Sequence, residues 1–204
     1  MIMNRIELIE SLTMRGVLKS PRLIEAFETV DRIDFVPQEL RYMAYEDRPL
    51  PIGEAQTISQ PYTVAFMLEL LQPNMSDKVL DVGSGSGWTT ALLASICKHV
   101  DAVERIEELV KFSKKNFSKY SFENISVHRA KQTLGLQGEY FDKILVSCAA
   151  DEVPKPLLRQ LSPGGTMVIP VNNSIIKVFK NSDGSLEIEE YPGFIFVPLI
   201  RDDI

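Results

Sequence analysis

The sequence predicts an α/β protein built on a doubly wound, mostly parallel sheet, and two stretches carry this prediction. In the first, an apolar run at residues 79–82 ends in Gly83, Gly85 and Gly87, and an alanine-containing apolar segment follows directly. Such glycines allow a tight turn from a strand into a helix and let a ligand approach the main chain. In the second, residues 99–104 read as the next strand and end in a carboxylate, about 20 residues after the glycines, where it can accept both hydroxyls of a ribose. Together they indicate a site for a nucleoside-type cofactor.

Trp88 stands where a dinucleotide fingerprint has its third glycine, so the turn reads G-x-G-x-G. We expect its ring to cover an apolar part of the ligand. The plainer alternative is that the glycines only make a turn and that Glu104 is a solvated charge beside Arg105.

Length and composition limit the organisation of the chain. With 204 residues, 45% of them hydrophobic, the chain is long enough for one full core. We therefore predict a single domain over residues 1–204, with residues 1–60 as an N-terminal helical and substrate-loop extension packed on it. The net charge is −6 and no basic tract is present, which disfavours nucleic-acid binding. Cys97 and Cys148 lie in separate apolar segments and indicate reduced thiols, hence a cytoplasmic protein.

The N-terminal residues predict helices and no targeting segment. Polar residues such as Arg5 and Glu7 interrupt any apolar run, so we expect neither a signal peptide nor a membrane span, and no membrane partner. We also expect a monomer. A first helix closes at Gly16, and Ser20-Pro21 is typical of the start of a second helix. We expect residues 34–37 to end this second helix.

Residues 48–61 contain three prolines and are predicted to form a loop. Pro61 begins a further helix with Gln60 as its N-cap. Several polar side chains therefore gather beside a helix N-terminus, which favours a carboxylate or another anion. For Ser59, the alternative is an ordinary capping hydroxyl.

The second half of the chain continues the α/β pattern. We predict a helix from about residue 106, strands near residues 125–128, 141–146 and 166–171, a helix through residues 157–161, a hairpin of residues 175–179 and 186–190, and a last strand at 194–199. His99 and His128 have no partner at metal-ligand spacing, so we expect both to be structural and no metal to be bound.

A series of motifs, in this order, resembles that of the protein-L-isoaspartate O-methyltransferases. The motifs lie at residues 35–37, 44–45, 50–53, 56–61, 83–87, 103–105, 160–165 and 196–199. The similarity covers the chain from about Leu23 onward. Gln-Thr-Ile-Ser-Gln-Pro at residues 56–61 is highly specific to this family, whereas many methyltransferases share the glycine turn.

The resemblance implies a seven-stranded, Rossmann-like methyltransferase fold. It also implies an enzyme that transfers a methyl group from S-adenosylmethionine to the carboxylate of L-isoaspartyl residues in damaged proteins or peptides, and that releases S-adenosylhomocysteine. By this resemblance Ser59 is the catalytic hydroxyl, and Asp81 lies behind the methionine moiety of the cofactor. The expected substrate-binding residues are Gln56, Thr57, Ile58 and Gln60, and the expected cofactor-binding residues are Asp81, Gly83, Ser84, Gly85, Gly87, Trp88, Glu104, Lys131 and Gln132.

The chemistry of such a reaction needs alignment more than proton transfer. A carboxylate with an ordinary pKa of about 4 is ionised at neutral pH and needs no general base. A hydroxyl such as that of Ser59 can hold one carboxylate oxygen by a hydrogen bond while the other oxygen attacks the methyl group.

Two positions depart from the family pattern. The family carries Gly-Asp-Gly, whose aspartate accepts a hydrogen bond from the adenine amino group, where this chain has Ala130, Lys131 and Gln132. Lysine is a donor only, so Gln132 or Thr133 supplies the oxygen, a backbone contact suffices, or the affinity has fallen. Ala55 replaces a glycine, which strains the loop if that site needs a positive φ.

Two other functions stay open. The first is an enzyme of the same fold that methylates a different carboxylate. The second is a binding homologue without turnover, which Lys131 favours.

Overall fold

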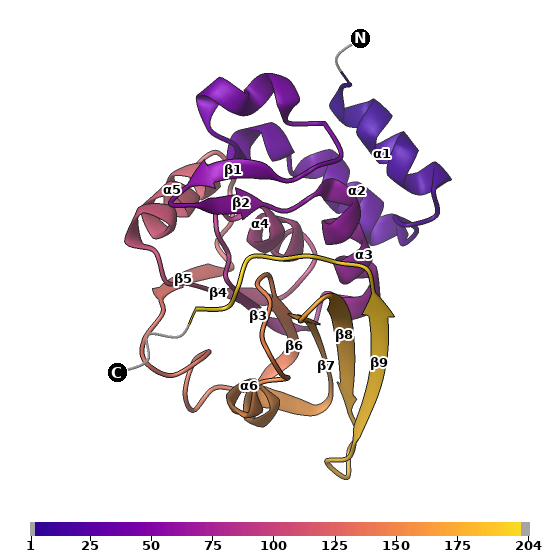
Figure 1. Cartoon of the computed structure of the whole chain (residues 1–204), viewed down its shortest axis with the longest axis vertical. Coiled ribbons are helices and arrows are strands. Elements are labelled where there is room, and N and C mark those ends of the chain that lie inside the picture. The colour runs from indigo at the N-terminus through magenta and orange to yellow at the C-terminus, as the bar shows by residue number, and fades with distance from the viewer. Residues whose placement is uncertain (1–2, 201–204) are drawn as a thin grey trace.

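The computed structural model describes residues 3–200 and contains a seven-stranded sheet with helices on both faces (Figure 1). Residues 1–2 and 201–204 of the predicted domain lie outside this described part. The strands are β3 (Lys78–Val82), β4 (His99–Glu104), β5 (Ile125–Arg129), β6 (Phe141–Val146), β7 (Leu161–Val171), β8 (Ser174–Lys180) and β9 (Leu186–Pro192), in the order β5-β4-β3-β6-β7-β8-β9. β8 runs antiparallel to both β7 and β9, and the other neighbouring strands of this sheet are parallel. The predicted doubly wound, mostly parallel sheet is confirmed.

The strand order reverses beside β3, and this reversal positions the site. From β3 the chain continues to β4 and β5 on one side and returns to β6 on the other. Val82 pairs with both Val103 of β4 and Val146 of β6, so the three strands end at the same level. In open α/β sheets, the crevice at the carboxyl ends of the strands beside such a reversal is the usual ligand site.

The apolar residues of the sheet alternate between two clusters. Val79 belongs to a cluster with α3 (Pro61–Leu71), α4 (Trp88–Ala94) and α5 (Glu107–Phe117), whereas Leu80 and Val82 belong to one with α6 (Lys155–Gln160). Successive side chains of a strand point to opposite faces, so these clusters cover the two faces of the sheet.

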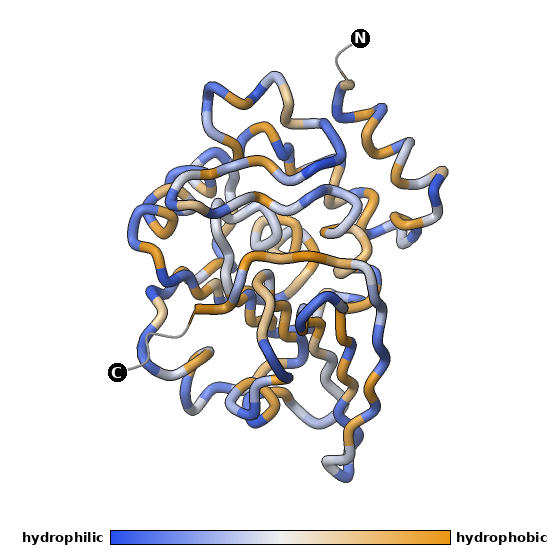
Figure 2. Tube along the Cα trace, viewed as in Figure 1, coloured by the Kyte–Doolittle hydropathy of each residue, from blue (hydrophilic) through white to orange (hydrophobic). Residues whose placement is uncertain are grey.

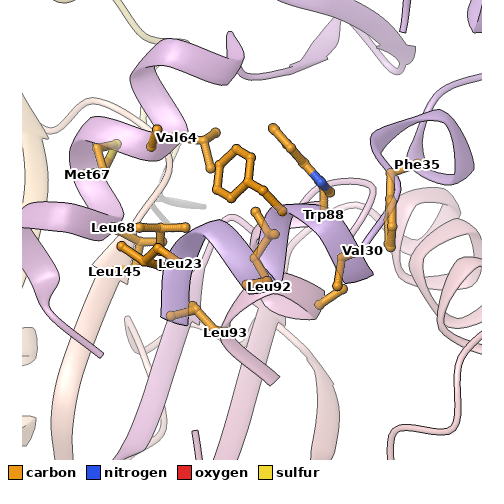
Figure 3. Close-up of a cluster of buried hydrophobic side chains, with 14 of the residues drawn as sticks. Leu23, Val30, Phe35, Val64, Met67, Leu68, Trp88, Leu92, Leu93 and Leu145 are labelled. Carbon is orange, nitrogen blue, oxygen red and sulfur yellow. The ribbon is translucent and has the colours of Figure 1, made fainter. Parts of the chain in front are cut away.

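The N-terminal extension shares the first of these clusters. It contains α1 (Arg5–Met14), α2 (Pro21–Thr29) and two 3₁₀ turns, η1 (Arg32–Phe35) and η2 (Gln38–Met43). Leu23, Val30 and Phe35 pack in one group with Trp88 and Leu92 of α4 (Figure 3). The extension and the sheet therefore bury a common apolar core.

The second helix ends earlier than predicted. It stops at Thr29, and the Asp31 side chain accepts a hydrogen bond from the Ile33 N–H at 3.2 Å. This cap starts the separate turn η1, so the prediction that residues 34–37 end the helix is wrong.

The prediction of a loop at residues 48–61 is also wrong. β1 (Leu50–Gly53) and β2 (Gln56–Ile58) form a two-stranded antiparallel hairpin outside the main sheet. Prolines exclude a central strand but are tolerated in a pair whose outer edges are free. Glu54 and Ala55 make the turn, with φ of 52° and 54°. A turn with two positive φ angles matches the twist of a hairpin and normally favours glycine or asparagine.

Ala55→Gly should therefore raise the free energy of unfolding. Ala55 has a φ of 54°, and an alanine in this region costs about 1–2 kcal/mol, partly offset by the greater freedom of glycine in the unfolded chain, which leaves a gain of about 0.5–1 kcal/mol. Urea unfolding checks it. The same change at Ala44, whose φ is −56°, should lower stability, and a loss at both positions would contradict the strain at Ala55.

Two predictions in the C-terminal half are wrong: one helix ends a residue early, and one strand does not form. α6 ends at Gln160, and Leu161 already begins β7. No strand forms at residues 194–199; only a single bridge joins Ala149 to Pro198.

We call residues 193–200 the C-terminal strap. Figures 1 and 2 show it as a largely hydrophobic segment that leaves β9 and crosses the molecule near β1 and β2. Ala149 N–H donates to the Val197 carbonyl at 2.8 Å, and Leu199 N–H donates to the Ala149 carbonyl at 2.7 Å.

No helix within residues 3–200 has the length and apolar character that crossing a bilayer requires.

Candidate functional site

A cavity of about 490 Å³ lies at the carboxyl ends of β3, β4 and β6. Its walls come from the glycine turn, Glu104, residues 130–140, hairpin residues 56–59 and strap residues 197–200. The volume lies in the range of about 300–1,000 Å³ that is typical of sites for small organic ligands. The fold thus joins segments that are far apart in the sequence into one site.

The glycine turn brings main chain directly to the cavity wall. Gly83 and Gly85 have φ of 77° and 55°, where a side chain would be strained. A Cβ atom would lie 3.1 Å from Cys148 Sγ at Gly83 and 3.2 Å from Ile52 Cδ1 at Gly85. A side chain at either glycine would be strained and crowded, so the turn presents its backbone to a ligand, with Ser84 on the same wall.

Glu104 is buried at the end of β4, and three backbone donors hold its carboxylate. Oε2 accepts from Gly85 N–H at 2.9 Å, and Oε1 accepts from Arg105 N–H at 2.8 Å and Ile106 N–H at 2.9 Å. The carboxylate therefore couples the glycine turn to β4. Glu104 also lines the cavity and is not a solvated surface charge.

Gly87 and Trp88 serve packing more than the cavity. Gly87 is not part of the wall, and a Cβ atom there would lie 2.5 Å from the Phe117 ring. Trp88 touches the wall but is only 2% exposed. Its ring packs edge-on against Phe27 at 5.5 Å and lies 5.3 Å from the Arg32 guanidinium. This burial leaves the indole little surface to cover a ligand, contrary to the expectation from the sequence.

Asp81 lies behind the wall, fully buried in β3. Thr90 Oγ1 donates to its Oδ2 at 2.6 Å, while Oδ1 has no hydrogen-bond partner among the described residues. Burial raises the pKa of Asp81 to about 7, the Thr90 hydrogen bond opposes this shift, and the Glu104 charge adds to it. Asp81 is therefore a buried group beneath the glycine turn, without contact to the cavity.

Ser59 stands between two cavities. A second cavity of about 260 Å³ is lined by Pro49, Thr57, Ser59, Gln60, Thr63, Ser147 and strap residues 195–197. Thr57, Ser59, Ser147 and Val197 line both cavities. Within residues 3–200 the Ser59 hydroxyl makes no hydrogen bond. It is therefore not a helix cap and is available to a ligand.

The carboxylate of Asp47, from the segment before β1, lies at the N-terminus of α3. Asp47 Oδ1 accepts from the Tyr62 N–H at 2.8 Å, and Asp47 Oδ2 pairs with Arg15 Nη1 at 2.5 Å. Gln60 Nε2 donates to the Asp47 carbonyl at 3.0 Å. Asp47 thus takes the position at this helix N-terminus that the sequence suggested for an external anion.

Gln56, Thr57 and Ile58 line the larger cavity with Ser59, and Gln60 lines only the smaller one. Lys131 and Gln132 lie on the opposite wall, and both are exposed. The expected substrate and cofactor residues are thus brought together, except for Gly87 and Asp81.

Other wall residues were missing from the expected site. Gln160 anchors the 130–140 segment, because its Nε2 donates to the Leu134 carbonyl at 2.9 Å and its Oε1 accepts from the Leu136 N–H at 2.8 Å. The strap contributes Val197 and Leu199. The closing motif at residues 196–199 is the sequence signal for the strap, although by itself it predicts a strand.

The histidines lie away from this wall. His128 Nε2 lies 2.7 Å from Asp101 Oδ1, and His99 Nε2 lies 3.7 Å from the same oxygen. In the part of the chain that the structure describes, no group of three or more His, Cys, Asp or Glu has an arrangement suited to a metal ion.

The fold and the site define the class of this protein, a Rossmann-like methyltransferase. A solved structure of a protein-L-isoaspartate O-methyltransferase from Plasmodium falciparum, in complex with S-adenosyl-L-homocysteine, matches it with a TM-score of 0.86. The match covers 98% of this chain and 100% of that chain at 24% sequence identity, so the two share their fold.

Sequence comparison identifies the family. The sequence model of the Protein-L-isoaspartate(D-aspartate) O-methyltransferase (PCMT) family matches residues 3–203. A protein-L-isoaspartate O-methyltransferase from Methanothrix thermoacetophila is 45% identical, over 97% of this chain and 95% of the relative. Another from Petrotoga mobilis is 43% identical, over 96% and 94%. The chain belongs to the PCMT family, which confirms the resemblance seen in its motifs.

Proposed function

We propose that this protein transfers a methyl group from S-adenosylmethionine to the carboxylate of L-isoaspartyl residues in damaged proteins or peptides. The products are a methyl ester and S-adenosylhomocysteine. The observation that carries this proposal is the unpaired Ser59 hydroxyl on the wall common to a larger and a smaller cavity. Such a junction suits a reaction in which two bound molecules meet. The relatives named protein-L-isoaspartate O-methyltransferase support the choice of acceptor.

The larger cavity has the features that the cofactor requires. Gly83 and Gly85 expose main chain on one wall, and Glu104 is held by three backbone donors. Oε1 accepts two of these N–H groups, whereas Oε2 accepts one and keeps acceptor capacity for a ribose hydroxyl. When bound, S-adenosylmethionine supplies an electrophilic methyl group on a sulfonium ion. Gln132 and Thr133 offer side-chain oxygens at the wall near Lys131 for the adenine amino group.

The smaller cavity suits the acceptor. Ser59 donates a hydrogen bond to one oxygen of the isoaspartyl carboxylate and leaves the other oxygen free to react. The carboxylate is ionised at neutral pH, so the chain need not supply a base. Thr57 and Gln60 line the same cavity and bind the acceptor beside Ser59. The task of these residues is to restrict motion of the reacting carboxylate.

We further propose that residues 1–204 act as one domain, as a cytoplasmic monomer that binds neither nucleic acid nor membranes. The apolar cluster common to the N-terminal extension and the sheet supports the single domain. The buried free thiols of Cys97 and Cys148 support a reducing compartment.

Radiolabelled methyl transfer tests the proposal directly. The purified protein is incubated with methyl-labelled S-adenosylmethionine and an isoaspartyl peptide, with the matching aspartyl peptide as control. We expect label only on the isoaspartyl peptide. Label on neither peptide, together with measurable cofactor binding by calorimetry, would favour a different carboxylate or a cofactor-binding homologue with lost activity. Absence of cofactor binding would contradict the proposed function.

Lys131→Asp should tighten cofactor binding. Lys131 lies on the wall of the larger cavity, where an acceptor in place of a donor gains a hydrogen bond worth about 1–1.5 kcal/mol, or about tenfold in Kd. Calorimetric titration with S-adenosylhomocysteine measures it. Lys115→Asp, an equal charge change at an exposed site of α5, is the control and should leave Kd unchanged. Unchanged or weaker binding in Lys131→Asp would reject this explanation of the substitution.

A further inference from the structure

A buried arginine lies behind Ser59, outside both cavities. The side chain of Arg32, in η1, is only 2% exposed. Its Nη1 donates to the Ala44 carbonyl at 2.6 Å and approaches the Glu46 carbonyl at 3.4 Å. Its Nη2 donates to the carbonyls of Arg48 and Ser59, both at 3.1 Å. One guanidinium therefore binds main chain on both sides of the β1–β2 hairpin.

These hydrogen bonds hold the two ends of the β1–β2 hairpin together. The chain enters β1 after residue 48 and leaves β2 at Ile58, so the carbonyls of Arg48 and Ser59 flank the hairpin. Both carbonyls share Nη2, and the rigid plane of the guanidinium fixes their separation. A lysine is a single flexible donor and cannot reproduce this geometry. Arg32 thus determines where the backbone of Ser59 lies relative to the entry segment, residues 44–48.

The same side chain contacts the cofactor side of the site. Its guanidinium lies 5.3 Å from the ring of Trp88, the first residue of α4 after the glycine turn. Trp88 is itself buried, so guanidinium and indole form a fixed contact in the core. Arg32 therefore connects the strand–turn–helix of the larger cavity to the segment that carries Ser59.

Packing alone does not account for an arginine here. Within residues 3–200 the guanidinium makes no ion pair, and its Nε has no hydrogen-bond partner. Burial lowers the pKa of Arg32 to about 9, which the charge of Asp47 partly offsets. An apolar residue of similar volume would avoid the free-energy cost of burying an unpaired charge. The buried guanidinium instead contacts four main-chain carbonyls, one of which is that of Ser59.

We infer that Arg32 is a positioning residue for methyl transfer, which holds the Ser59 hydroxyl at the junction of the two cavities through the Ser59 carbonyl. Arg32 lines neither cavity, so it acts on the acceptor through the main chain of Ser59 and not by contact with a bound molecule. The inference rests on the function proposed above for this site.

Kinetics of Arg32→Lys test the inference. We expect kcat for an isoaspartyl peptide to fall about tenfold, while Kd for S-adenosylhomocysteine changes less than about twofold, because the cofactor wall keeps its residues. Arg22→Lys is the matched control: Arg22 also donates to a carbonyl, that of Pro73, at the far end of α3. It should behave like the wild type. Equal kcat values for Arg32→Lys and Arg22→Lys would overturn the inference.

A double-mutant cycle separates positioning from general destabilisation. In a Ser59→Ala background no hydroxyl remains to be positioned, so Arg32→Lys should lower kcat by less than about twofold. A merely structural role predicts the same fold-change in both backgrounds. Independent, multiplicative effects would therefore contradict the inference.

A second variant, and a measurement that does not depend on turnover, keep the inference testable if Arg32→Lys folds poorly. Arg32→Met removes the buried charge at similar volume but leaves four carbonyl contacts without a donor; circular dichroism checks that it folds, and the folded variant should lose kcat as Arg32→Lys does. Without turnover, hydrogen exchange at the paired residues of β1 and β2 should be faster in Arg32→Lys than in the wild type, because the hairpin loses the hydrogen bonds at its base. Equal exchange of β1 and β2 in the two proteins would overturn the inference whether or not the enzyme methylates an isoaspartyl peptide. Failure of the wild type to transfer methyl groups would instead count against the proposed function.

Discussion

Ser59→Ala should lower kcat for methyl transfer to an isoaspartyl peptide by about 10- to 100-fold, because a hydrogen bond to a charged group is worth about 1.5–3 kcal/mol. Ser59 lies on the wall common to both cavities, and its hydroxyl is free to donate. The hydroxyl is assigned to the acceptor, so Kd for S-adenosylhomocysteine should stay within about twofold of the wild-type value.

Steady-state kinetics and calorimetry on the same preparation measure both quantities. Ser118→Ala, at the exposed end of α5, removes a hydroxyl far from the site and is the control. Wild-type kcat in Ser59→Ala would remove Ser59 from the mechanism. A large loss of cofactor affinity with kcat retained would instead assign the hydroxyl to the larger cavity.

Glu104→Gln should weaken cofactor binding by about 100-fold or more. The carboxylate accepts from Gly85, Arg105 and Ile106 N–H groups, and an amide NH₂ in its place faces at least one of these donors. The variant also loses the charge that receives a ribose hydroxyl, and the loss of that charge-assisted hydrogen bond together with the disturbed contact to the glycine turn accounts for about 3 kcal/mol or more.

Titration with S-adenosylhomocysteine measures this loss, and thermal unfolding should show a lower Tm because buried donors lose their acceptor. Glu107→Gln is the matched control, since Glu107 lies three residues further on in the first turn of α5. It should bind as the wild type does. Equal Kd values in the two variants would rule out Glu104 as the ribose acceptor.

The elements around the glycine turn were predictable because their signals are local. The apolar run before Gly83, the glycines themselves and the alanine-containing segment specify strand, turn and helix over neighbouring residues. The polar run at residues 56–60 was likewise identified before its surroundings were known. Its neighbour Ala55 was identified as a site of strain, and its φ is 54°.

Other features depend on contacts that no local pattern contains. Asp47 caps α3 from 15 positions before Tyr62, and Arg32 reaches Ser59 across 27 positions. The strap is fixed by an isolated bridge to Ala149, which leaves no strand periodicity to detect. Side-chain burial is equally non-local: Trp88 and Asp81 directly flank the glycine turn in sequence, yet both face the core.

The sequence by itself determined the family, the order of strands and helices from β3 to β9, and the residue types available for binding a nucleoside cofactor and a carboxylate. Only the tertiary structure decided that the proline-rich segment is a hairpin, that Ser59 joins two cavities, and that Arg32 holds it. The physical reason is the distance along the sequence over which each interaction acts. Backbone preferences and apolar periodicity act between neighbouring residues, whereas cavities, buried charges and capping carboxylates arise when distant segments exclude water together.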